Sequence, residues 1–242
     1  MSRVALVTGG STGIGAAVAA QLAGLGIRVA ICDINADAGE ALAQKIDGMY
    51  IACDVTQLAS VQDAVAACVN GLGVPDYAHL NAGIMTVPTG DPFLAIEEVS
   101  PEQYRRIVGV NLDGVYHGLK TLMPIMRENG GAITITASTA GLGVVPVDPL
   151  YTATKYAVIG LGRAVAASNT GSNIRINMIC PGVVDTAIVP DDYRQPEFGM
   201  MPTSVIAAEI VDLLQTGDNG EVRVKLNADR AAFRVEPQDL SG

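Results

Sequence analysis

A tyrosine and a lysine four residues apart are suited by type and spacing to proton transfer. Tyr151 and Lys155 share one face if the surrounding residues form a helix, because residues four apart are neighbours on a helix surface. A phenol has a pKa of about 10, and a neighbouring ammonium group stabilises the phenolate. We therefore expect Lys155 to lower the pKa of Tyr151, so that Tyr151 acts as a general acid–base on an alcohol or ketone oxygen.

Ser138 follows a segment rich in β-branched residues that we predict to be a strand. Its hydroxyl is expected to hydrogen-bond the same substrate oxygen as Tyr151 and to stabilise the charge that develops there. The alternative to this catalytic role is that the helix carrying Tyr151 and Lys155 simply exposes a surface tyrosine, with an ordinary lysine one turn later.

A glycine-rich segment near the start of the chain is typical of a phosphate-binding turn. It reads Thr8-Gly9-Gly10-Ser11-Thr12-Gly13-Ile14-Gly15 and lies between a predicted strand and a predicted helix. Glycines let the backbone approach a pyrophosphate, and the helix N-terminus supplies free N–H groups and a partial positive charge. A glycine-rich turn without a ligand is the alternative. The context favours a dinucleotide site formed by Gly9, Ser11, Thr12, Gly13, Ile14 and Gly15.

An acidic residue at the end of the second predicted strand indicates which dinucleotide binds. Asp33 lies 20 residues after Gly13, where a carboxylate accepts hydrogen bonds from the adenosine ribose of NAD. The same charge repels the 2′-phosphate of NADP, and the open positions of the turn hold Ser11 and Thr12. We predict NAD as the cofactor, bound partly by Asp33 and Ile34. The alternative is that Asp33 only caps the turn into the next helix.

Six motifs follow one another along the chain. They are the glycine-rich turn, Asn81-Ala82-Gly83, Asn111, Ser138, Tyr151-x-x-x-Lys155 and Pro181-Gly182. From about residue 3 to about residue 190, the chain resembles the short-chain dehydrogenase/reductase family in its compact, NAD-dependent form. The resemblance implies an alcohol dehydrogenase or ketone reductase with the catalytic residues Asn111, Ser138, Tyr151 and Lys155. It implies cofactor contacts from Asp54, Val55, Asn81, Ala82, Gly83, Tyr151, Lys155, Pro181, Gly182, Val184 and Thr186, with Lys155 at the nicotinamide ribose.

Some details of this resemblance leave questions open. Asn111 would hold a water molecule that links Lys155 to solvent, but the flanking Gly109 and Gly114 also suit a break in a helix. Members usually have Asn-Asn-Ala-Gly where this chain has Leu80-Asn81-Ala82-Gly83, which puts some structural hydrogen bonding in doubt. The C-terminal segment lacks the Asp-Gly-Gly that the family often shows, and it is similar to prostaglandin-dehydrogenase-like members.

The motifs lie at the ends of predicted strands that alternate with helical segments. The strands are expected at residues 3–8, 28–33, 49–53, 77–80, 131–137, 174–180 and 222–226. Helical segments are expected at 13–25, 36–46, 57–72, 101–129 (one helix or two), 150–169 and 203–215. Such alternation forms βαβ units. We predict one α/β domain over residues 1–242, with a Rossmann-type doubly wound, mostly parallel seven-stranded sheet and helices on both faces.

Composition excludes several classes of protein. The 242 residues include 15 basic and 25 acidic side chains with no basic cluster, so nucleic acid is not an expected partner. No apolar run approaches the ~20 residues of a membrane-spanning helix, and we expect a cytoplasmic protein without a membrane partner. The four cysteines lack metal-site spacing, so neither a disulfide nor a metal site is expected. These cysteines, together with His79 and His117, are expected to be core or half-buried.

The substrate is expected to be a hydrophobic secondary alcohol or its ketone. The residues expected to face it are mostly apolar, and a covering segment lies at about 185–202; they are Met85, Leu142, Val144, Val145, Pro146, Ile188, Tyr193, Phe198, Met200 and Met201. Two other functions stay open: a catalytically silent NAD-binding regulatory protein, and an isomerising or dehydrating enzyme that uses bound NAD transiently.

Apolar residues on more than one face of the helices at 101–129 and 150–169 predict a homo-oligomer, either a tetramer or a dimer. They include Val110, Val115, Leu119, Leu122 and Met126.

Overall fold

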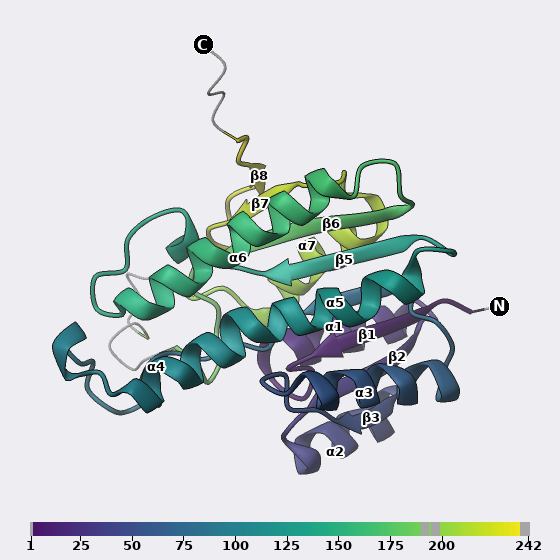
Figure 1. Cartoon of the computed structure of the whole chain (residues 1–242), viewed down its shortest axis with the longest axis horizontal. Helices are drawn as coiled ribbons and strands as arrows, with labels where there is room; N and C mark the ends of the chain where they lie inside the picture. Colours follow the sequence, from purple (N-terminus) through teal and green to yellow (C-terminus); the bar gives the residue numbers. More distant parts are fainter. Residues whose placement is uncertain (1, 190–193, 195–198, 238–242) are drawn as a thin grey trace.

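Strands and helices alternate along the chain as predicted (Figure 1), in a computed structural model that describes residues 2–189, 194 and 199–237. The strands are β1 (Val4–Thr8), β2 (Arg28–Asp33), β3 (Met49–Ala52), β4 (Tyr77–Leu80), β5 (Gly131–Thr136), β6 (Ile174–Pro181), β7 (Val222–Lys225) and β8 (Phe233–Arg234). The α-helices are α1 (Gly13–Gly24), α2 (Ala36–Ile46), α3 (Leu58–Gly71), α4 (Pro101–Val108), α5 (Gly114–Met126), α6 (Pro149–Ser168) and α7 (Thr203–Thr216).

The strands form one twisted sheet in the order β3-β2-β1-β4-β5-β6-β7-β8. The first seven are parallel, as predicted, and the short β8 adds an eighth strand antiparallel to β7. The sequence analysis places seven strands and misses this one, because two residues are too few to show a periodic pattern. Arg234 of β8 is held by an ion pair with Glu221, 3.0 Å between Nη2 and Oε2.

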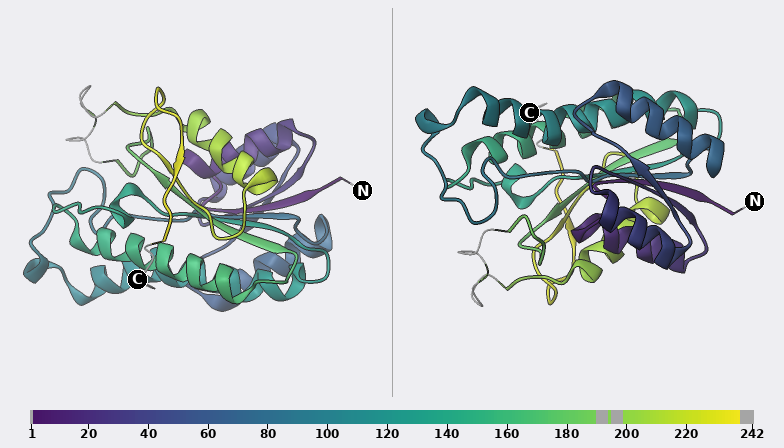
Figure 2. Two further views of the ribbon diagram at one scale, coloured as in Figure 1. Left: turned by 90° about the horizontal axis from the view of Figure 1, so that it is seen from above. Right: turned by 90° about the horizontal axis from the view of Figure 1, so that it is seen from below.

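Helices cover both faces of the sheet (Figure 2): α1, α2 and α7 pack on one face, and α3, α5 and α6 on the other. The central strands are buried on both sides, which is why they read as nearly continuous apolar runs. All four cysteines are buried free thiols, as expected. Among the described residues, no helix is both long and apolar enough to cross a lipid bilayer.

The segment at 101–129 forms two α-helices joined by a π-helical turn at Gly109–Asp113. Asn111 lies in this turn and is fully buried. The break agrees with the flanking glycines, and it matters for the site because π-turns inside helices re-aim the side chains that they carry.

The order of the strands reverses direction between β1 and β4. A ligand crevice is expected beyond the carboxyl ends of those two strands.

Candidate active site

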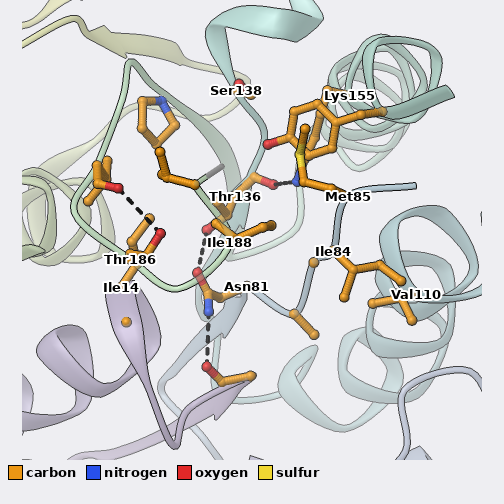
Figure 3. A pocket seen from close by; sticks show the side chains of 18 of the residues that line it. Ile14, Asn81, Ile84, Met85, Val110, Thr136, Ser138, Lys155, Thr186 and Ile188 are labelled. Carbon is orange, nitrogen blue, oxygen red and sulfur yellow. Dashed lines mark hydrogen bonds between the residues drawn. The ribbon is translucent and has the colours of Figure 1, made fainter. Parts of the chain in front are cut away.

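A cavity of about 430 Å³ lies beyond the carboxyl ends of β1, β2, β4, β5 and β6 (Figure 3). Most of the predicted site residues meet in its lining: Gly9, Thr12, Gly13, Ile14, Asp33, Ile34, Asp54, Val55, Asn81, Ala82, Gly83, Ser138, Tyr151, Lys155, Pro181, Gly182, Val184 and Thr186. Ser11, Gly15 and Asn111 do not line it. The cavity thus joins residues that lie up to 180 positions apart, from Gly9 to Val189.

The glycine-rich turn follows β1 and leads directly into α1. Gly9 and Gly13 have φ angles of +59° and +55°, a region that favours glycine. Gly15 lies behind the turn, where a Cβ atom would approach the carbonyl oxygen of Gly9 to 2.2 Å. Gly15 therefore lets α1 pack closely against the turn rather than forming the cavity wall.

Asp33 is fixed at the cavity by two backbone N–H groups. Its Oδ2 accepts a hydrogen bond from Ser11 N at 2.9 Å, and its Oδ1 accepts one from Asn35 N at 3.0 Å. The N-cap of α2 is Asn35, whose Oδ1 accepts from Ala38 N. Ser11 therefore supports Asp33, and the capping role considered for Asp33 belongs to Asn35. Ile34 is 77% exposed beside Asp33 at the cavity.

Asp54 lies at the cavity near Asp33, directly before Val55. Its Oδ1 accepts hydrogen bonds from both the backbone N and the Oγ1 of Thr56, at 2.9 and 2.8 Å. The carboxylate thus stabilises a turn. The carbonyl of Val55 is 2.8 Å from Nδ1 of His117, which makes His117 a half-buried structural residue, as expected.

Asn81 connects the glycine-rich turn to the centre of the sheet (Figure 3). Its Nδ2 donates to Gly9 O at 3.1 Å, and its Oδ1 accepts from Thr136 Oγ1 at 3.0 Å. Nε2 of His79 lies 3.2 Å from the same Thr136 hydroxyl. Burial lowers the pKa of His79 to about 3, so this ring is neutral and is a core residue, as predicted. Leu80, at the position where the family has asparagine, packs in the core instead.

Ser138, Tyr151 and Lys155 meet at the end of the cavity next to β5. Nζ of Lys155 donates to the carbonyl of Thr136 at 3.0 Å and lies 5.4 Å from the centre of the Tyr151 ring. Ser138 acts on the Tyr151 hydroxyl and lowers its pKa. Ser138 begins a 3₁₀ turn in which its Oγ accepts from Ala140 N at 3.1 Å. These three side chains can hold and move a proton at one substrate oxygen.

The expected lowering of the tyrosine pKa is wrong for this structure. The pKa of Tyr151 is raised to about 12, mainly by burial and to a smaller extent by the carboxylate of Asp148. The hydrogen bond from Ser138 acts in the opposite direction but is outweighed. Burial also lowers the pKa of Lys155 to about 8, because removing either group from water disfavours its charged form. Tyr151 therefore carries its proton at neutral pH.

Asn111 lies behind the catalytic residues rather than in the cavity wall. Its Oδ1 accepts from Ile84 N at 2.8 Å, and its Nδ2 donates to Ile84 O at 2.9 Å and to Thr154 Oγ1 at 3.1 Å. It thus joins the π-helical turn to α6 and to the loop after β4. A Cβ on Gly83 would lie 3.4 Å from Lys155 Nζ and 3.6 Å from Asn111 Oδ1, so Asn111 and Lys155 both approach Gly83.

The substrate wall agrees only partly with the expected residues. Met85, Val145 and Ile188 line the cavity. Leu142, Val144, Pro146, Met200 and Met201 do not, while Tyr193 and Phe198 lie outside the described residues, as does part of the covering segment at 185–202. Val144 is 78% exposed, whereas Met201 donates its N–H to Val183 O and packs in the core with α1 and α7.

Sequence reasoning missed several apolar residues of this wall, namely Ile84, Val110, Val147, Val183, Ala187 and Val189. Each of the six is a direct neighbour in sequence of a predicted residue, which is a signal that could have found them. Val110 precedes Asn111 and reaches the cavity from the π-helical turn.

Comparisons with known proteins agree with this geometry. Residues 3–197 match the short chain dehydrogenase family. The chain is 36% identical to 2-(R)-hydroxypropyl-CoM dehydrogenase of Xanthobacter autotrophicus, over 81% of this chain and 80% of that protein. It is 34% identical to 3-alpha-(or 20-beta)-hydroxysteroid dehydrogenase of Mycobacterium bovis, over 90% and 84%. The 3-ketoacyl-(acyl-carrier-protein) reductase of Brucella melitensis, solved with NADH, superposes with a TM-score of 0.85 at 29% identity, over 94% and 98%. The chain is therefore an oxidoreductase that belongs to the short-chain dehydrogenase family.

Proposed function

We propose that the protein interconverts a hydrophobic secondary alcohol and its ketone, with NAD as the cofactor. The observation that carries this proposal is the meeting of Ser138, Tyr151 and Lys155 in the cavity that the glycine-rich turn also lines. A binding protein without turnover has no need for a tyrosine, a serine and a lysine that meet in this way, which argues against the regulatory alternative.

The residues present fit a nicotinamide dinucleotide. The lining runs from the carboxylate of Asp33, past the glycine-rich turn, to Lys155. At Gly9 a Cβ would lie 2.8 Å from the Cα of Ala82, so a larger residue would close the turn against the loop after β4. Bound nicotinamide supplies the hydride acceptor or donor. Asp33 would hold the adenosine ribose, and Lys155 the ribose next to the nicotinamide.

The proton is moved by Tyr151. In ketone reduction, the protonated phenol donates its proton to the substrate oxygen, while Ser138 hydrogen-bonds that oxygen and stabilises its developing charge. In alcohol oxidation the phenolate accepts the hydroxyl proton. Because burial raises the pKa of Tyr151 to about 12, oxidation should speed up as the pH rises above neutral.

The wall around the catalytic residues favours an uncharged substrate. Ile84, Met85, Val145, Val147 and Ile188 are apolar. Among the described lining residues, the charged ones are Asp33 and Asp54, at the proposed adenosine end, and Lys155, whose Nζ already binds a carbonyl. An uncharged cyclic or linear alcohol suits such a wall, because binding removes apolar surface of the substrate and of the wall from water without burying an unpaired charge.

A panel of alcohols tests the proposed activity. Purified protein with NAD should form NADH, measured by absorbance, from uncharged cyclohexanol or 2-octanol faster than from 4-hydroxycyclohexanecarboxylate. Product without net NADH would support the isomerising alternative, and NAD binding without any product would support the regulatory one. A preference for the carboxylate would contradict the proposed uncharged substrate.

We predict that Asp33 sets the preference for NAD over NADP. Asp33→Ala should weaken NAD binding by about tenfold, since a hydrogen bond to a charged group contributes about 1.5–3 kcal/mol. The same change should strengthen NADP binding because it removes the charge that opposes the 2′-phosphate. Fluorescence titration with both cofactors measures the two effects, with the exposed Asp37→Ala on α2 as the control. A wild-type preference for NADP would contradict the role given to Asp33.

We also propose a homodimer or homotetramer, but on different residues from those first considered. Val115, Leu119, Leu122 and Met126 are buried in the core of the single chain, so they leave no face for a partner. The exposed apolar side chains in this region are Tyr104 on α4, Tyr116 on α5 and Tyr156 on α6. Light scattering should give a particle of at least twice 25.0 kDa. A 25.0 kDa particle at micromolar concentration would rule the assembly out.

A further inference from the structure

A buried carboxylate lies beside the catalytic helix and has no part in the chemistry described so far. Asp148 is 2% exposed and forms the N-cap of α6. Its Oδ1 accepts a hydrogen bond from the backbone N of Tyr151 at 2.9 Å, so it fixes the turn that carries the phenol. An N-cap with an acceptor side chain needs no charge, and serine or asparagine serves as well. The presence of a buried anion at this position therefore calls for another reason.

The same carboxylate also holds the loop that forms the substrate wall. Thr86 donates its backbone N–H to Asp148 Oδ2 at 2.9 Å and its hydroxyl to Oδ1 at 2.6 Å. Thr86 is itself buried, and it directly follows Met85, which lines the cavity (Figure 3). All three partners of Asp148 are donors, which suits an ionised carboxylate because that group only accepts.

We propose that Asp148 is a positioning residue that ties the Met85 wall to the turn carrying Tyr151 and places its carboxylate beside that turn. The inference rests on the proposed function, in which Tyr151 exchanges the substrate proton. It has two separable consequences. The bonds to Thr86 set the fit of the substrate, and the charge adds to the larger effect of burial in raising the pKa at which Tyr151 accepts a proton.

The charged and titratable groups around Tyr151 allow this role. On α6, Lys155 lies 5.4 Å from the ring, and Asp148 raises the pKa of the phenol. From β6, the thiol of Cys180 faces the pair, but burial raises its own pKa to about 12, so it is neutral at neutral pH. From α4, Arg106 donates to Thr86 O at 2.9 Å. Among the described carboxylates, Asp148 is the one that raises the pKa of Tyr151.

Removing the charge tests the second consequence. Asp148→Asn and Asp148→Ser both keep an acceptor for the Tyr151 N–H. In either, the rising limb of kcat/KM against pH for alcohol oxidation should move to lower pH by about half a unit or more, as expected when a like charge near a phenol is lost. The assay uses NAD and the best alcohol of the panel. The control is Asp76→Asn. It removes the charge of a carboxylate that accepts a hydrogen bond from Val4 N, at the N-terminal ends of β1 and β4 and therefore away from the cavity.

Removing one hydrogen bond tests the first consequence while the charge stays. Thr86→Val should raise KM for the alcohol about fivefold or more, because a lost hydrogen bond to a charged group costs about 1.5–3 kcal/mol. The rising limb of kcat/KM should stay at the wild-type pH, because the carboxylate is still present. Thr86→Ser keeps the hydroxyl and should restore the wild-type KM. Thr216→Val removes a threonine–aspartate hydrogen bond on α7, outside the described cavity lining, and serves as the matched control.

Two results would overturn the inference. One is that the rising limb of kcat/KM against pH stays at the wild-type pH in folded Asp148 variants, which would leave Asp148 as a purely structural cap. The other is an unchanged KM in Thr86→Val, which also decides the question if neither Asp148 variant folds. Failure of the proposed function is distinguishable, because it would appear as undiminished activity in a Tyr151 variant that lacks the hydroxyl.

Discussion

Tyr151→Phe is expected to reduce turnover in both directions by about 10²–10⁴-fold, the usual contribution of a general acid–base group. The substitution keeps the ring, which lies against Lys155, and removes the hydroxyl that meets Ser138. NAD affinity should change little, because Asp33 and the glycine-rich turn bind the other end of the cofactor. Steady-state rates with NAD and the best alcohol, and NAD titration of the same preparation, measure the two quantities.

The control for this variant is Tyr156→Phe. Tyr156 is on the same helix but is exposed, so it should retain wild-type turnover. A Tyr151→Phe rate within about threefold of wild type, far below the range for a general acid–base, would show that Tyr151 does not carry the proton. The mechanism proposed for this chain would then be wrong, whatever the cofactor.

Lys155→Ala is expected to have two effects at once. NAD affinity should fall about 10–100-fold, since hydrogen bonds from a charged group contribute about 1.5–3 kcal/mol. Below about pH 8, where Lys155 is charged, alcohol oxidation should also slow down, because the ammonium group 5.4 Å from the ring favours the phenolate. Isothermal titration with NAD and a pH–rate profile measure these effects, and exposed Lys120→Ala on α5 is the control.

The sign of the pH effect follows from the pKa of the lysine. Burial lowers that pKa to about 8, so Lys155 is charged below about pH 8 and loses its charge above it. The difference between Lys155→Ala and wild type should therefore be largest below pH 8 and should shrink as the pH rises. A difference that grows with pH would mean that Lys155 acts by its shape and not by its charge.

The sequence by itself determined the parts of this protein that depend on short-range spacing. Alternating apolar strands and helices predicted the parallel sheet, because each element has its own period. The glycine-rich turn, Asp33 at the end of β2, and Tyr151 with Lys155 one helical turn later are local patterns in which residue type and distance along the chain suffice. The cavity lining confirms that these segments come together. The role of each residue in cofactor binding or catalysis remains a prediction.

Tertiary structure decided what depends on burial and on contacts between distant segments. From the sequence, Lys155 was expected to lower the pKa of Tyr151, yet burial raises that pKa. The hydrogen bonds between Asp148 and Thr86 join residues 62 positions apart, and no local sequence pattern predicts them. Met201 looked like a substrate contact but fills the core. The pKa of a side chain depends on how much water surrounds it, and a hydrogen bond between distant residues depends on where the chain brings them. Only the folded chain determines both.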